Sequence, residues 1–191
     1  ENSFLFENET GLAGFSLSRN QGAIIRKVLD ETGAIECRFR VDGRLGKGDL
    51  FCVTGCLRGA RNPEEEVVVV AHLYEAGAND NCSGVAGSIQ ALHAIKELIR
   101  KGLLAPPART IRVIFTMEIV GFLAYFSRAV RPGTRYVAGV NPDMIGEDHR
   151  KCRSTLHIYQ SPDSAATFAD PLLIDFIRRS AAPSFRHEIK G

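Results

Sequence analysis

Val67 to Gly84 reads Val-Val-Val-Val-Ala-His-Leu-Tyr-Glu-Ala-Gly-Ala-Asn-Asp-Asn-Cys-Ser-Gly, and the fold is organised around this stretch. It opens with an apolar, β-branched run without polar alternation, which is typical of a strand buried on both faces of a sheet. His72 follows the run, and a turn of small residues then leads to Asp80 and the start of a helix. Histidine and carboxylate together suit zinc or a similar divalent ion. The stretch therefore predicts a metal site at the end of a buried strand.

From residue 66 onward, strand-like segments alternate with helix-like segments. We expect strands at 67–73, 110–117, 136–140 and 153–159, and helices over about 83–102, over 119–130 and from about 171. This alternation favours an α/β layered fold with a largely parallel sheet. The preceding part of the chain predicts a helix over 18–33 and two strands, at 34–42 and 49–57.

Four side chains of acid–base or metal-ligating type stand where these predicted strands end. His72, Glu118 and Asp143 each lie at or just after the end of a strand, and Asp80 lies in the loop that follows the first of them. Sites in parallel sheets gather beyond the carboxyl ends of the strands, so we expect the four on one rim. Each alone has a simpler interpretation: Asp80 and Glu118 could cap helices, and Asp143 could be an ordinary turn residue.

The composition is that of an ordinary globular protein. The chain has 191 residues, 45% of them hydrophobic and 24% charged, and a net charge of +2 with the basic residues scattered. We therefore expect neither a nucleic-acid nor a membrane partner, because no basic patch and no apolar run of membrane-spanning length is present. The five cysteines are odd in number and irregularly spaced, which favours free thiols and a cytoplasmic location. The oligomeric state leaves no signal in the sequence.

We expect residues 1–191 to form a single α/β domain. The length and the start at Glu1 without a methionine suggest a fragment of a larger chain. Residues 1–65 are expected to supply either part of an accessory region or the edge strands and first helix of the sheet.

Several motifs, taken in order, resemble those of the zinc aminopeptidase superfamily, which includes bacterial leucyl aminopeptidases and glutaminyl cyclase. They are His72, the run Gly-Ala-Asn-Asp-Asn-Cys-Ser-Gly at 77–84, Glu118, and Asn-Pro-Asp-Met-Ile-Gly at 141–146. The resemblance covers roughly residues 14–147 and looks nearest to a bacterial aminopeptidase-like branch of poorly assigned function. It implies a three-layer α/β/α sandwich with a mixed, largely parallel central sheet.

The resemblance also implies a role for each residue of the rim. The family pattern has two metal ions bridged by one aspartate and a water. In this chain His72 and Asp143 would hold one metal, and Asp80 would be the bridge. Glu118 would be the general base that accepts a proton from the attacking water. The peptide bond between Asp80 and Asn81 would be cis, as it is in relatives.

Three departures from the family pattern concern the second metal and its surroundings. Ile119 stands where members usually have a second glutamate that binds the second metal. The expected downstream histidine has only His187 as a candidate, in a context unlike the family's. Tyr74 replaces an aspartate that often supports the first histidine. The first metal therefore keeps a full set of protein ligands, and the second keeps only the bridge.

Three functions are compatible with this pattern. The first is a zinc-dependent, aminopeptidase-like hydrolase that acts on a peptide or aminoacyl substrate, with one zinc expected and two possible. The second is a non-catalytic binding module on the same fold, which the missing second-site ligands favour. The third is acyl transfer or cyclisation at a single zinc. Glu118 favours hydrolysis over the binding module, because an inactive site has no need of a base.

Overall fold

A computed structural model describes residues 16–40, 42, 48–128, 133–180 and 187–190. The chain divides into two compact units, residues 1–48 and 49–191. In the first unit, α1 spans Arg19–Thr32 and confirms the predicted helix. The Ser18 side chain caps its first turn. The strand predicted at 34–42 is wrong for the described residues of that range, which are exposed and form no ladder. A strand-like sequence needs a hydrogen-bonded neighbour to become a strand.

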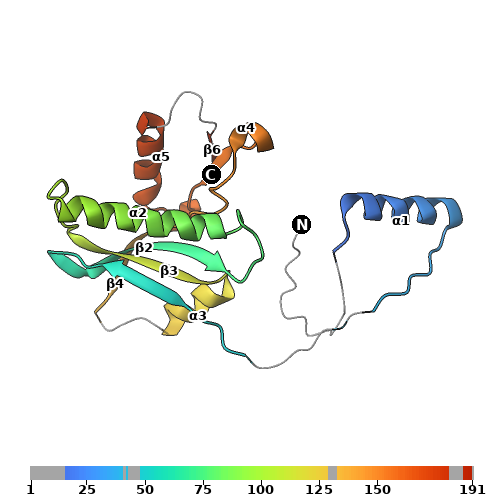
Figure 1. Ribbon diagram of the computed structural model, residues 1–191, viewed down its shortest axis with the longest axis horizontal. Coiled ribbons are helices and arrows are strands. Elements are labelled where there is room, and N and C mark those ends of the chain that lie inside the picture. The colour runs from blue at the N-terminus through green and yellow to red at the C-terminus, as the bar shows by residue number, and fades with distance from the viewer. Residues whose placement is uncertain (1–15, 41, 43–47, 129–132, 181–186, 191) are drawn as a thin grey trace. The chain divides into compact units, whose positions relative to one another are not determined.

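The second unit is built on a four-stranded sheet with the order β1-β3-β2-β4. Its strands are β1 (Val53–Leu57), β2 (Asn62–Leu73), β3 (Arg109–Met117) and β4 (Arg135–Val140). The long strand β2 is central and runs parallel to both β3 and β4, whereas β1 pairs antiparallel with β3. This mixed, largely parallel sheet confirms the predicted fold class (Figure 1).

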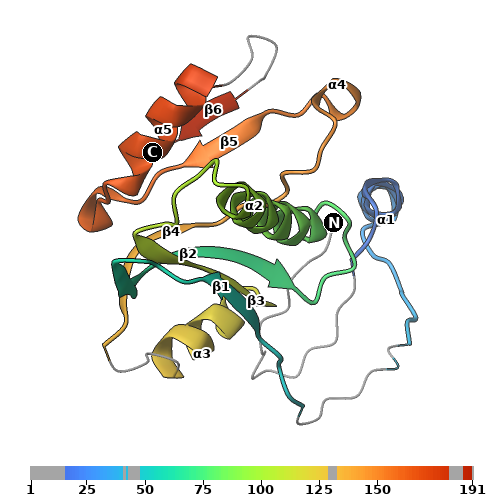
Figure 2. The ribbon, with the colours of Figure 1, turned by 60° about the vertical axis from the view of Figure 1, so that its left-hand side comes forward.

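Helices cover both faces of the sheet. Helix α2 (Cys82–Arg100) lies over one face and α3 (Val120–Arg128) over the other (Figures 1 and 2). The core cluster joins the two central strands to α2 and consists of Ala71, Val113 and Phe115, with Val69, Leu73, Val85 and Leu92 packed against it. Helix α3 is less buried than its apolar sequence predicts, because side chains such as Leu123 remain exposed.

Charged side chains are built into the amino-terminal ends of the parallel strands. Arg112 donates two hydrogen bonds to the Glu66 carboxylate, at 2.6 and 2.9 Å, and both side chains are buried. This pairing raises the pKa of Arg112 further above its usual value. Glu65 accepts hydrogen bonds from Arg109 and Arg135, which begin β3 and β4. These contacts join the three parallel strands where they start.

The chain after β4 forms a smaller arrangement. Strand β5 (Leu156–Tyr159) pairs parallel with β6 (His187–Lys190) in a separate sheet (Figure 2). Three short helical elements accompany it: α4 (His149–Cys152), η1 (Asp163–Ala165) and α5 (Ala169–Ser180). The strand predicted at 153–159 therefore exists in part, but outside the main sheet. Among the described helices, none has the length and apolar character to cross a membrane.

Candidate metal centre

The carboxyl ends of the parallel strands bring several ionisable side chains together. His72 is the penultimate residue of β2, Glu118 directly follows β3, and Asp143 comes three residues after β4. Asp80 lies in the loop between β2 and α2. Because β2 is flanked by β3 and β4, the segments that follow all three strands meet around His72.

One nitrogen of the His72 imidazole faces two carboxylates. Its Nε2 lies 3.3 Å from Oδ1 of Asp80 and 3.5 Å from Oδ2 of Asp143. The histidine side chain is buried, whereas the two aspartates are partly open to solvent. Three ligand atoms that converge from a strand end and two loops form a group that can hold a cation.

The other nitrogen of the imidazole faces a residue that the sequence did not single out. His72 Nδ1 lies 3.4 Å from Oε2 of Glu75, and both side chains are buried. Ligand atoms of His72, Glu75 and Glu118 also lie within 4.8 Å of one another. The sequence does offer a sign of this role. Tyr74 stands where relatives often have a supporting aspartate, and the carboxylate of Glu75 follows directly after it.

A buried asparagine ties the two aspartate loops together. The Asn81 side chain donates a hydrogen bond to the carbonyl oxygen of Pro142 at 3.2 Å and accepts one from the backbone of Gly84 at 3.0 Å. The second contact caps the first turn of α2. The Asp80–Asn81 peptide bond is cis, as the resemblance implied.

A second set of contacts joins the same loops. Asn79 Oδ1 accepts a hydrogen bond from the backbone of Gly146 at 3.0 Å and one from the Ser83 hydroxyl at 3.2 Å. A Cβ on Gly84 would lie 2.1 Å from the Pro142 carbonyl oxygen, and one on Gly146 would lie 2.7 Å from Ser83 Cβ. Only glycine allows the two loops to approach so closely.

Positive φ angles mark the backbone around the site. Three residues other than glycine adopt them there: Tyr74 (φ 74°), Ile119 (φ 54°) and Met144 (φ 50°). Each is the immediate neighbour of a carboxylate, because Tyr74 precedes Glu75 and the other two follow Glu118 and Asp143. This conformation is unfavourable for a β-branched residue such as isoleucine, and such residues cluster at functional sites.

Comparison with known proteins places the chain in a family. Residues 53–182, more than half of the chain, match the model of peptidase family M28. The chain belongs to this family. No curated protein is similar enough to the chain to give a match. Membership in M28 confirms the superfamily that the motifs at 77–84 and 141–146 suggested. The resemblance to one bacterial aminopeptidase-like branch of this superfamily stays a prediction.

The M28 family is metal-dependent, and the residues of this chain fit a divalent cation. Four carboxylates, from Glu75, Asp80, Glu118 and Asp143, lie around a single imidazole. Burial raises the pKa of Glu75, and the Asp80 carboxylate beside it acts in the same direction. Within the part of the chain that the structure describes, Asp143 Oδ1 is buried without a hydrogen-bond partner. A cation at this point would offset the repulsion between the carboxylates and satisfy the buried oxygen.

The remaining predicted residues of the M28 pattern contribute less to this geometry. Ile119 is exposed and has no donor atom, so it adds nothing to a second metal site. The backbone of His187 lies in β6, and its side chain falls outside what the structure describes.

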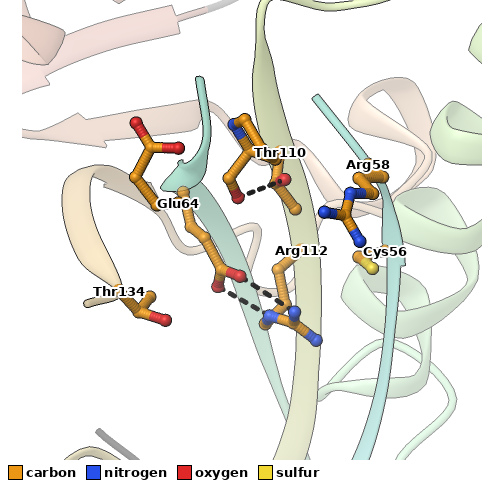
Figure 3. A pocket seen from close by; sticks show the side chains of 8 residues that line it. Cys56, Arg58, Glu64, Thr110, Arg112 and Thr134 are labelled. Carbon is orange, nitrogen blue, oxygen red and sulfur yellow. Dashed lines mark hydrogen bonds and ion pairs between the residues drawn. The ribbon is translucent and has the colours of Figure 1, made fainter. Parts of the chain in front are cut away.

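A separate cavity of about 370 Å³ lies at the opposite end of the parallel strands (Figure 3). Its lining includes Cys56, Arg58 and Arg112, which Figure 3 labels, and also Glu66, the partner of Arg112 described above. None of the M28 motif residues lines it. The M28 motif residues lie instead on the rim around His72.

Proposed function

We propose that this M28 protein is a zinc-dependent aminopeptidase with one zinc held by His72, Asp80 and Asp143. The observation that carries the proposal is the convergence of Asp80 Oδ1 and Asp143 Oδ2 on Nε2 of His72, at 3.3 and 3.5 Å. Histidine with carboxylates is a usual donor set for catalytic zinc. Peptide or aminoacyl substrates follow from the family and from the leucyl aminopeptidase resemblance of the motifs.

The chain's own residues supply the rest of the reaction. A divalent cation bound at this site would provide Lewis-acid chemistry, making water more acidic and polarising a carbonyl. Glu118 lies on the same rim, in a group with His72, and is partly buried. We assign it the general base, which accepts the proton of the water that attacks the substrate carbonyl.

We propose that this site holds a single zinc ion. The segment after β3 offers one carboxylate, Glu118, because Ile119 cannot coordinate a metal. The other group near the site, Glu75, faces Nδ1 of His72 rather than the nitrogen that faces Asp80 and Asp143.

Metal content tests the ligand assignment. The purified chain, dialysed against metal-free buffer after zinc loading, should retain about one zinc by plasma mass spectrometry. Asp80→Ala should lose it, while Asp163→Ala, an exposed aspartate in η1, should retain it. No zinc in the wild type would refute the metal site, and two per chain would show that further ligands exist.

Turnover tests the role of Glu118. Screening the zinc-loaded chain on aminoacyl p-nitroanilides identifies a substrate, and Glu118→Gln should then lower kcat by about 10²–10⁴-fold without loss of zinc. Glu64→Gln, an exposed glutamate at the far end of β2, is the matched control. Equal rates for Glu118→Gln and wild type would exclude Glu118 as the base. Tight zinc binding with no turnover would instead favour a binding module on the same fold.

A further inference from the structure

Among the described residues, two buried side chains near the proposed zinc, His72 and Glu75, carry polar atoms without a hydrogen-bond partner, and the Glu75 carboxylate also lies beside that of Asp80. The Nδ1 atom of His72 and both carboxylate oxygens of Glu75 are buried and make no hydrogen bond in the part of the chain that the structure describes. The two side chains are only 3% and 8% exposed, and their nearest atoms are 3.4 Å apart. Buried polar groups without a partner are costly, so this arrangement needs an explanation.

The two nitrogens of the His72 ring serve different neighbours. Nε2 faces Asp80 and Asp143, whereas Nδ1 faces Glu75. A neutral imidazole that offers Nε2 to a metal must carry its proton on Nδ1. A carboxylate beside that proton fixes both the tautomer and the orientation of the ring. Among the described carboxylates around His72, Glu75 makes the close contact with Nδ1 and can do this.

We propose that Glu75 is the positioning residue of His72, accepting a hydrogen bond from Nδ1–H and holding Nε2 toward Asp80 and Asp143. This inference rests on the proposed function, because the orientation of Nε2 matters only if that nitrogen binds the proposed zinc. The 3.4 Å separation is at the long end of the range for a hydrogen bond, as contacts in unliganded sites often are.

The backbone explains why Glu75, and not the residue before it, takes this place. Along a strand, the residue two positions after His72 would lie on the same face. That residue is Tyr74, whose φ of 74° interrupts the strand geometry at the end of β2. Its hydroxyl accepts a hydrogen bond from the backbone N–H of Phe51 at 2.6 Å and donates one to the Phe51 carbonyl oxygen at 3.3 Å. Tyr74 is thus held elsewhere, and Glu75 turns to the buried imidazole.

A competing role for Glu75 is ligation of a second ion together with Glu118. Their ligand atoms and one of His72 lie within 4.8 Å of one another, so the distances allow it. That role would require the same imidazole to bind an ion through Nδ1 as well as through Nε2. It therefore predicts two ions per chain and no proton on Nδ1.

Nitrogen-15 NMR of histidine-labelled protein tests the hydrogen bond directly. In the metal-free chain, His72 should show an Nδ1–H signal protected from solvent exchange, assigned by its absence in His72→Gln. The signal should vanish from Glu75→Leu and persist in Glu75→Gln, whose side-chain oxygen can still accept the bond. A wild-type spectrum with the proton on Nε2 alone would overturn the inference without requiring any variant.

Zinc affinity, measured by competition with a chromogenic chelator, tests the consequence. Glu75→Leu should weaken zinc binding by about 10–100-fold at unchanged stoichiometry, while Glu75→Gln stays within a few-fold of wild type. Glu64→Gln is the exposed control. Unchanged affinity in Glu75→Leu would refute the positioning role, and a fall from two ions to one would make Glu75 a ligand. If the wild type binds no zinc but shows the protected Nδ1–H, the proposed function fails and the Glu75–His72 bond stands.

Discussion

The side-chain amide of Asn81 donates a hydrogen bond to the carbonyl oxygen of Pro142, 3.2 Å away and 61 residues along the chain. This contact connects the loop that carries Asp80 to the loop that carries Asp143. Asn81 is almost completely buried, so its side-chain amide cannot readily exchange this bond for one to water. The relative position of the two aspartates therefore depends on a residue that is not itself a ligand.

Replacing Asn81 should weaken the fold and the metal site together. Asn81→Ala removes the cap of α2 and the bond to Pro142, and leaves buried groups unpaired, so we expect a loss of about 2–4 kcal/mol in the free energy of unfolding. Denaturant titration measures the loss. Asn81→Asp separates the two contacts, because a carboxylate can accept from Gly84 but cannot donate to Pro142. A variant Asn81→Ala with wild-type stability and zinc affinity would contradict this account.

Two glycines of α2 should differ in their tolerance of alanine. A Cβ on Gly84 would meet the Pro142 carbonyl oxygen at 2.1 Å, whereas one on Gly87 would meet only the end of the Ile145 side chain at 2.7 Å. Backbone cannot move aside as a side chain can. Gly84→Ala should therefore cost more than Gly87→Ala, with a difference of roughly 1–3 kcal/mol in unfolding free energy. Thermal and denaturant unfolding of the two variants side by side provide the comparison, and equal effects would argue against close contact between the loops.

Removing one partner of the buried Glu66–Arg112 pair should destabilise the protein, whereas replacing both partners with apolar residues should not. Arg112→Met leaves Glu66 without its bidentate partner in a buried position, and we expect a loss of about 3–5 kcal/mol. The double variant Glu66→Leu/Arg112→Met removes both charges, and its stability should recover to near that of the wild type. Unfolding curves of the single and double variants form the test. A double variant no more stable than Arg112→Met would contradict the expected recovery.

The pairing of Glu65 should be visible at acid pH. Hydrogen bonds from Arg135 and Arg109 hold the pKa of Glu65 below its usual value. A lowered carboxyl pKa contributes stability that is fully present above the unfolded-state value of about 4.3 and is lost as the pH falls through the folded value. Glu65→Gln should therefore show a shallower loss of stability below about pH 4 than the wild type. The measurement is the free energy of unfolding as a function of pH for wild type, Glu65→Gln and the control Glu64→Gln. If wild type and Glu65→Gln lose stability in parallel as the pH falls, Glu65 does not contribute to acid sensitivity.

Much of the sheet and the family could be predicted because their signals are local. The valine run at 67–70 predicts a strand buried on both sides, and β2 is the central strand of the sheet. The motifs at 77–84 and 141–146 indicated the superfamily, which the M28 match confirms. Glycine is required at Gly84 and Gly146 of these motifs because the opposing loop approaches each of them closely.

The errors arise where structure depends on contacts distant in sequence. Residues 34–42 alternate like a strand, but no ladder forms among those described, because pairing needs a partner that local sequence does not reveal. Residues 153–159 are predicted as a fourth strand, and the observed part of it, β5, pairs with β6 outside the main sheet. The position of Glu75 could not be predicted for a related reason. Strand periodicity places Tyr74 on the same face as His72, and it does not indicate that Tyr74 adopts a positive φ angle.

The close approach of Gly84 and Gly146 to the opposing loops has a consequence for protein design. The ligand loops interlock through their backbones, so neither has its shape independently of the other. Transplanting His72, Asp80 and Asp143 alone onto another α/β scaffold would carry over the donor atoms without the template that spaces them. The smallest portable unit is His72 together with the pair of loops, 77–84 and 141–146, mounted on two adjacent parallel strands with the separation of β2 and β4.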